Sequence, residues 1–164
     1  MSFPTELLQQ LQDTAFATAI GESVWLFPTI ETIHVLALAL VVGSIAVVDL
    51  RLLGWASARR AVSSIAREVL PWTWAAFTVA LISGGLLFSS KAVQYYNNIP
   101  FRIKIALLLA AGLNMLWFQL RTYRDVAQWD AAAKPPAGAR WAGSFSLVFW
   151  VGVVAAGRWI GFVL

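Results

Sequence analysis

Apolar residues are concentrated in four long runs along the chain, and short polar segments separate these runs. At about 1.5 Å of rise per residue, each run is long enough to cross the roughly 30 Å hydrocarbon core of a bilayer as a helix. The pattern therefore predicts membrane-spanning helices at about residues 28–53, 71–90, 100–120 and 144–163.

A shorter amphipathic segment precedes the first run. Within residues 4–20, Leu8 and Leu11 fall on one helical face and Gln9 and Asp13 fall on the other. The segment is too polar to span a bilayer, so we expect a helix that lies on the membrane surface. The chain is thus predicted to be a single all-α transmembrane domain over residues 1–164, a four-helix bundle with an N-terminal surface helix.

The composition supports a chain that contacts the lipid bilayer. Hydrophobic residues make up 60% of the 164 positions and charged residues only 12%, whereas soluble domains have about 25% charged residues. Cysteine is absent, which excludes disulfides, thiolate-bound metals, iron–sulfur clusters and covalently attached haem of the c type. Any metal would have to be held by histidine, carboxylate or methionine side chains.

The basic residues predict the orientation in the membrane. Arginines and lysines flank the first and third connections between the runs, whereas the N-terminal tail has none. The positive-inside rule places both connections in the cytoplasm and therefore both termini outside. We expect a multi-pass membrane protein with both termini on the outer side. Because this orientation accounts for the net charge of +4, we expect no nucleic-acid partner.

A layer of polar residues is expected in the outer half of the membrane. Glu31 and His34 are three residues apart on one face of the first span. Lys104 near the start of the third span and Arg158 near the end of the fourth lie at a similar depth. An ionisable residue within a span is costly unless paired or hydrated, and it often marks function. The ordinary alternative is that these charges only serve helix ends and lipid headgroups.

Three kinds of chemistry could use this layer. His34, the only histidine in the sequence, could ligate haem b, with Glu31 orienting it and Lys104 or Arg158 neutralising the propionates. Ligation by two histidines would then require a symmetric dimer. A copper or zinc ion shared between chains is the second candidate. The third is the binding or movement of a proton, a small anion or a quinone headgroup.

A second set of polar residues is expected to be structural. Asp49 and Arg51 lie at the cytoplasmic end of the first span, where neighbouring charges and water would anchor the helix. Asp49 could also accept a hydrogen bond from Arg121 at the matching end of the third span. Asn114, in the middle of that third span, is predicted to bond across helices or to line an inner polar contact.

Small residues at a four-residue spacing indicate close helix packing. Ala39 and Gly43 form such a pair in the first span, and Gly157 and Gly161 form one in the fourth. At about 100° per residue, Gly43 lies about 180° from His34 around the helix axis. The pattern predicts a tight bundle or a homo-oligomer, with His34 facing something other than the partner of Gly43.

The first span also carries the pattern of a known family. Its E-x-x-H in IETIH, followed by LALALVVGS and then DLRLLG, resembles a family of small bacterial four-helix membrane proteins of unknown function. The residues that carry the resemblance are Glu31, His34, Gly43, Asp49, Arg51 and Gly54. The resemblance extends over essentially the whole chain and implies the fold and the membrane location. A looser similarity to copper-resistance and b-type cytochrome membrane domains implies a ligand-bearing helix, although those domains carry several histidines.

Two functional hypotheses follow. The first is an inner-membrane protein that holds haem b or a metal through His34 and takes part in electron transfer with quinone or another redox partner. The second is a non-catalytic carrier or channel for a proton or small anion, or an accessory subunit of a larger membrane complex. The chain shows no nucleophile with a base and no phosphate-binding loop, so hydrolytic and nucleotide-dependent activities are not expected.

Overall fold

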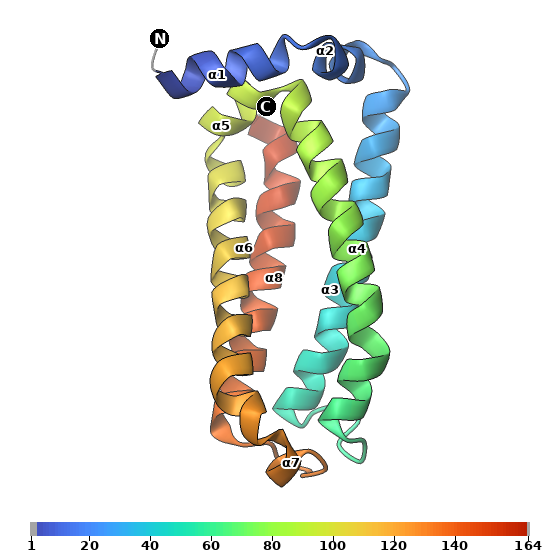
Figure 1. Ribbon diagram of the computed structural model, residues 1–164, viewed down its shortest axis with the longest axis vertical. Coiled ribbons are helices and arrows are strands. Elements are labelled where there is room, and N and C mark those ends of the chain that lie inside the picture. The colour runs from blue at the N-terminus through green and yellow to red at the C-terminus, as the bar shows by residue number, and fades with distance from the viewer. Residues whose placement is uncertain (1–2, 164) are drawn as a thin grey trace.

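The computed structural model describes residues 3–163, and all regular structure in that range is helical (Figure 1). The four long helices are α3 (Leu26–Leu53), α4 (Val62–Ser90), α6 (Ile99–Trp117) and α8 (Ala137–Val163). All four are long and apolar enough to cross a membrane, the third together with the segment that continues it to Trp129. The prediction of an all-α chain with membrane-capable helices is therefore confirmed.

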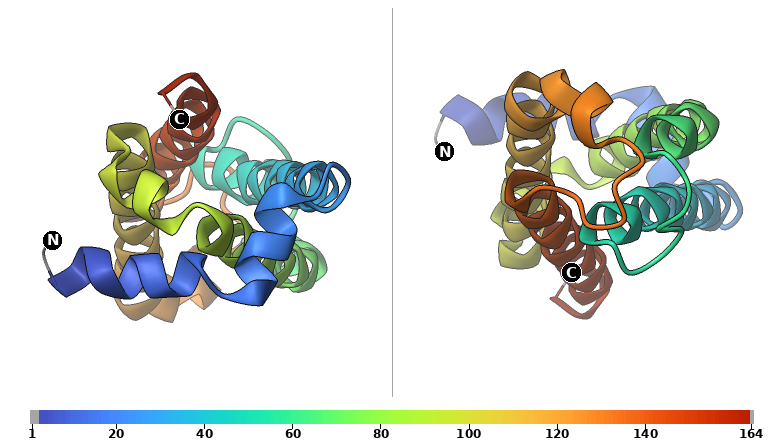
Figure 2. Two further views of the ribbon diagram at one scale, coloured as in Figure 1. Left: turned by 90° about the horizontal axis from the view of Figure 1, so that it is seen from above. Right: turned by 90° about the horizontal axis from the view of Figure 1, so that it is seen from below.

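The long helices form two antiparallel pairs. Helix α3 packs along α4, α6 packs along α8, and the pairs join where α3 meets α8 (Figures 1 and 2). Gly143 on α8 permits this junction, because a Cβ there would lie 3.1 Å from the backbone oxygen of Asp49 and 3.2 Å from the Cβ of Leu52. Among the described residues, α4 and α6 are not a closely packed pair, so the bundle is less tightly closed on that side.

Short helices cover both ends of the bundle. At the terminal end, where α8 finishes, α1 (Phe3–Gln12) and α2 (Ala15–Glu22) lie across the long helices (Figure 1). Helix α5 (Ala92–Asn97) packs against α1 at this end. At the opposite end, which we call the loop end, α6 continues through three short elements. These are a π-helical turn (Phe118–Thr122), a 3-10 turn (Tyr123–Asp125) and α7 (Val126–Trp129).

Helix boundaries differ from the predicted ones where polar residues provide caps. The surface helix expected over residues 4–20 is broken, because Thr14 is extended and its hydroxyl accepts a hydrogen bond from the Ala17 backbone N–H at 3.3 Å. Helix α4 begins at Val62 and includes Pro71, and α8 begins at Ala137. Hydropathy marks the apolar part of a helix, whereas the helix itself extends into the polar interface when its first turn is capped.

Apolar side chains fill the interior of the bundle and also cover much of its outer surface. Its central core consists of Val41, Ala76, Ala111, Trp150 and Val153. On the outer surface each long helix presents large apolar side chains; their exposed fractions include 64% for Leu36, 66% for Leu81, 68% for Leu113 and 65% for Val148. Side chains this exposed on all four helices fit a surface surrounded by lipid.

A buried arginine holds the loop end together. Arg51 is wholly buried, and its Nε donates to the backbone oxygen of Arg60 at 2.7 Å. Its Nη2 donates to the backbone oxygens of Asp130 at 3.2 Å and Ala132 at 3.0 Å. One guanidinium therefore ties the end of α3 to the α3–α4 connection and to the segment that precedes α8. Figure 2, right, shows these segments at the loop end.

Asp130 completes this junction by capping α4. Its carboxylate accepts hydrogen bonds from the backbone N–H of Ser63 at 2.8 Å and from the Ser63 hydroxyl at 2.5 Å. Its backbone oxygen accepts from the Val62 N–H at 3.0 Å. These hydrogen bonds to the charged form, led by the Ser63 hydroxyl, hold the pKa of the Asp130 carboxyl below its usual value.

Candidate functional site

His34 has a hydrogen-bonding partner on each ring nitrogen. Its Nδ1 lies 3.0 Å from the Ser83 hydroxyl on α4, and its Nε2 lies 3.4 Å from Nζ of Lys104 on α6. A charged ammonium group can only donate, so Nε2 accepts and the imidazole proton is on Nδ1. That proton is donated to Ser83, whose hydroxyl donates in turn to the backbone oxygen of Val79 at 2.6 Å. With a charged Lys104, these contacts are compatible with a neutral imidazole that carries its proton on Nδ1.

Two glycines make room for this cluster. A Cβ on Gly84 would lie 3.0 Å from Cε1 of His34, so the ring packs directly against the backbone of α4. A Cβ on Gly157 of α8 would lie 3.7 Å from Nζ of Lys104, so the ammonium group reaches α8 as well. The cluster of His34, Ser83 and Lys104 is therefore positioned by all four long helices, and we call it the terminal-end cluster.

The structure does not bring Glu31 and Arg158 into the terminal-end cluster. Glu31 is exposed, and its charge acts on Tyr95 of α5. Burial is the main cause that raises the pKa of the Tyr95 hydroxyl, and the negative charge of Glu31 is the second cause. Arg158 is exposed and its guanidinium carbon lies 4.7 Å from the ring centroid of Phe162. Of the four residues predicted to form an outer layer, His34 and Lys104 are in contact.

A metal or haem would need a free nitrogen on His34. Both nitrogens are engaged, so ligation through Nε2 would require Lys104 to move away, whereas a hydrogen bond from Nδ1–H to Ser83 is of the kind that orients a ligating histidine. Among the described residues, no group of three or more histidine, aspartate or glutamate side chains is placed to hold a metal ion. Haem b or metal ligation by His34 therefore stays a prediction, and Lys104 is the group that would have to make room for it.

The residues predicted to be structural lie in the loop-end half. Asn114 donates from Nδ2 to the Ala142 backbone oxygen at 2.9 Å, so it links α6 to α8. Arg121 is exposed, with its guanidinium carbon 5.2 Å from the ring centroid of Trp117, and it is not the neighbour of Asp49. The Asp49 carboxyl is buried, and its side-chain hydrogen-bonding neighbour is Ser146 on α8.

Asp49 and Asn114 both line a cavity in this half of the bundle. The cavity has a volume of about 310 Å³ and receives residues from all four long helices. The apolar core around Val41, Ala111 and Val153 lies between it and the terminal-end cluster. In this conformation the described residues thus form two separate polar regions, with an apolar layer between them.

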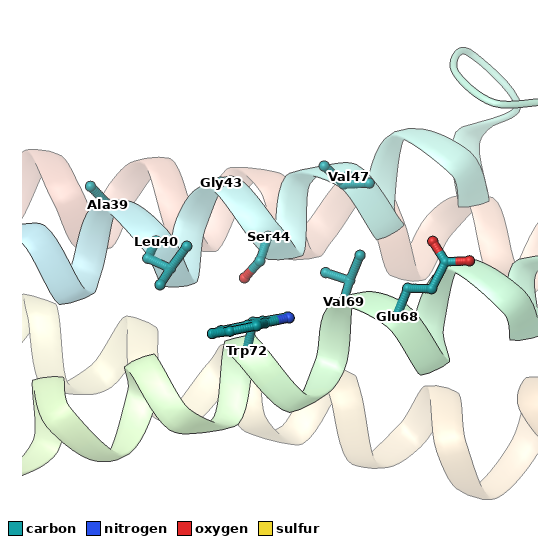
Figure 3. Close-up of a pocket in the computed structure, with 8 residues that line it drawn as sticks. All are labelled: Ala39, Leu40, Gly43, Ser44, Val47, Glu68, Val69 and Trp72. Atoms are coloured by element: carbon teal, nitrogen blue, oxygen red, sulfur yellow. The ribbon is translucent and has the colours of Figure 1, made fainter.

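A second hollow lies on the outer surface of the α3–α4 pair (Figure 3). Figure 3 shows Gly43 on its α3 side and Trp72 on its α4 side. A Cβ on Gly43 would meet nothing within 4 Å, so the predicted small-residue face of α3 does not pack within this chain. Two polar side chains of this hollow are occupied, because Glu68 is paired with Arg60 and the Ser44 hydroxyl donates to the Val41 backbone oxygen.

Sequence reasoning missed the residues of α4 that complete the terminal-end cluster. Ser83 and Gly84 stand together in an otherwise apolar stretch of that helix. Their distance from the end of α4 is similar to the distance of His34 from the start of α3. A serine–glycine pair at the depth of a lone histidine was the available signal, but only packing shows that the two face each other.

The four helices long and apolar enough to cross a membrane fit a multi-pass α-helical membrane protein. Within that class, the chain belongs to a family of unknown function (DUF6644), whose model matches residues 9–163. The expectation of an uncharacterised family is thereby confirmed. No curated protein and no solved structure matches the chain. Because the family has no assigned activity, function has to be argued from the residues themselves.

Proposed function

We propose that this chain is a non-catalytic membrane protein that takes up a small anion together with a proton at the terminal-end cluster. The observation that supports this function is the position of Lys104. Its side chain is largely buried, its ammonium group lies beside a neutral imidazole, and the ion pair among the described residues is formed elsewhere, by Arg60 and Glu68. A cation without a counter-ion in apolar surroundings favours an anionic ligand.

The contact between Lys104 and His34 couples the anion to a proton. Protonation of His34 would place two positive charges 3.4 Å apart, a repulsion of about 5 kcal/mol at an effective dielectric constant of about 20. An anion bound between the two groups would remove this repulsion, so the anion and the proton favour each other's binding. Ser83 from α4 is neutral, the charge of Glu31 acts on Tyr95, and the Arg158 guanidinium lies over the Phe162 ring.

The finer sequence predictions belong to this proposal. The cluster would lie in the outer leaflet of a bacterial inner membrane, with both termini in the periplasm, and the chain would associate through its exposed Gly43 face or with a larger complex. Haem b or metal ligation by His34, with electron transfer, stays a prediction. The engaged ring nitrogens favour the proton and anion hypothesis over it.

Calorimetric titration with sodium acetate tests the proposed function. The purified protein would be titrated at several pH values between 5 and 8, with sodium gluconate as a bulkier comparison anion. We expect saturable acetate binding that tightens by up to about tenfold for each unit of pH decrease while His34 is neutral in the free protein, because one proton accompanies each anion.

Three variants identify the residues involved. Lys104→Met and His34→Gln should each weaken acetate binding at least tenfold, and His34→Gln should also remove its pH dependence. Arg102→Gln is the matched control, because Arg102 is an exposed cation on the same helix end and should leave binding within twofold of the unchanged protein. Acetate binding that does not respond to Lys104→Met would refute the proposed function.

A further inference from the structure

The cavity in the loop-end half is a second candidate site, separate from the terminal-end cluster. Its volume of about 310 Å³ lies at the small end of the range for pockets that hold small organic ligands. Its walls are mostly apolar and include the aromatic rings of Trp74, Phe77, Phe118 and Trp150. These walls suit a compact ligand with an apolar body.

The mouth of the cavity lies between α4 and α6. Trp74 on α4 and Gly112, Met115 and Gln119 on the α6 side line the cavity and are also exposed on the surface. This surface belongs to the membrane-capable part of both helices. A ligand that enters here therefore comes from the lipid phase, which selects for lipophilic molecules.

Asp49 gives this apolar cavity a specific polar group. The residue is only 5% exposed, and its Oδ2 is buried without a hydrogen-bond partner. Of the described residues that line the cavity, it alone has a charged side chain. A buried carboxylate oxygen without a donor is costly, so a bound group that supplies a donor would be stabilised there.

The other polar groups of the cavity do not fill this role. The Asn114 amide donates to the Ala142 backbone oxygen, and the Thr73 hydroxyl donates to Ser44 on α3. Ser146 is the one side chain that interacts with the Asp49 carboxyl, and it leaves Oδ2 without a partner. Gln119 and Tyr123 also line the cavity with donor groups, but neither is bonded to Oδ2 in this structure. The Oδ2 atom is therefore open to a donor from a bound ligand.

We propose that this cavity binds a lipophilic organic cation, a protonated amine on a compact apolar body, with its ammonium group at Asp49. Such a ligand donates a hydrogen bond to Oδ2 and also neutralises the carboxylate. The aromatic walls add attraction for a cation and cover the apolar body. A neutral alcohol of the same shape would provide the hydrogen bond but not the opposite charge, so it should bind more weakly.

Binding of tritiated phenethylamine tests this site. The full chain would be placed in nanodiscs of neutral phosphatidylcholine, and binding to empty nanodiscs would be subtracted, because the amine also partitions into lipid. We expect saturable binding at pH 7. The neutral comparison compound, 2-phenylethanol, should compete at least tenfold less effectively than unlabelled phenethylamine.

Two substitutions address the charge and the space separately. Asp49→Asn keeps the shape of the side chain and should weaken phenethylamine binding at least tenfold, while competition by 2-phenylethanol changes less than threefold. Gly112→Phe should block the mouth and abolish saturable binding, since Gly112 lines the cavity and a Cβ there would meet nothing within 4 Å. Gly85→Phe is the matched control, because Gly85 is equally open on α4 but does not line the cavity.

The outcomes separate this site from the proposed anion site. Lys104→Met should leave phenethylamine binding unchanged, whatever the result of the acetate titration. Absence of saturable binding, equal competition by the alcohol, or full binding in Asp49→Asn would overturn the proposal. Unchanged binding in Gly112→Phe would overturn the assignment to this cavity, and size-exclusion chromatography of every variant verifies that the bundle is intact.

Discussion

Replacement of Arg51 by methionine is the strongest test of how the loop end is held together. Methionine is similar in length and apolar, so Arg51→Met removes the guanidinium group with a small change in volume. The backbone oxygens of Arg60, Asp130 and Ala132 would then lose their donor. Two connections that are far apart in the sequence would no longer be tied to the end of α3.

The expected magnitude follows from these hydrogen bonds. Bonds to a charged group contribute about 1.5 to 3 kcal/mol each, and the guanidinium makes three of them. Two effects make the expected loss smaller than the sum of these three bonds. In the variant, the buried charge and its unpartnered Nη1 no longer have to be desolvated, and water can reach the freed carbonyls near the loop end. We therefore expect a loss of about 3 to 5 kcal/mol in the free energy of unfolding, the range for removing one partner of a buried charged network.

The assay is equilibrium unfolding in mixed micelles with increasing SDS, followed by tryptophan fluorescence. Arg121→Met is the control, since Arg121 is exposed over Trp117 and its loss should cost about 1 kcal/mol or less. Arg51→Met should also increase tryptic cleavage after the exposed Arg59 in the α3–α4 connection. If Arg51→Met is no less stable than Arg121→Met, the buried guanidinium does not hold the connections, and the reasoning fails.

Three further predictions concern the terminal-end cluster and the α4 cap. Gly84→Ala should lower the free energy of unfolding by about 1 to 3 kcal/mol and weaken acetate binding, because the added Cβ would lie 3.0 Å from His34. The control Gly85→Ala should be neutral or stabilising, because a Cβ there meets nothing within 4 Å. An equal loss of stability in both variants would contradict this prediction. Because its hydrogen bonds from Ser63 lower its pKa, the Asp130 carboxylate stabilises the fold above about pH 4, and this contribution is lost as the pH falls through the folded-state pKa. Unfolding free energies from pH 7 to 3 should show a loss below about pH 4 that is smaller in Asp130→Asn; equal losses would refute it. Absorption spectra of oxidised and dithionite-reduced protein should lack a Soret band, and a reducible band that disappears in His34→Ala would replace the anion hypothesis with the haem hypothesis.

The candidate sites were only partly predictable from the sequence. A lone histidine and a lysine within apolar runs identified His34 and Lys104, because ionisable residues are rare inside spans. Glu31 and Arg158 were predicted at the same depth, but depth does not specify direction around a helix axis. In the structure both side chains are exposed, and the Arg158 guanidinium lies over the Phe162 ring. Asp49 was assigned to the interface, whereas packing against α8 buries its carboxyl at a cavity.

The sequence by itself determined that four helices can cross a membrane, since hydropathy and length depend only on which residues follow one another. It also determined which side chains carry chemistry. Only the tertiary structure decided that Ser83 and Lys104 meet His34, that Arg51 binds three backbone oxygens rather than a carboxylate, and that a cavity remains between α4 and α6. Those contacts depend on helix rotation and pairing, which are set by the summed packing of small and large side chains across the bundle.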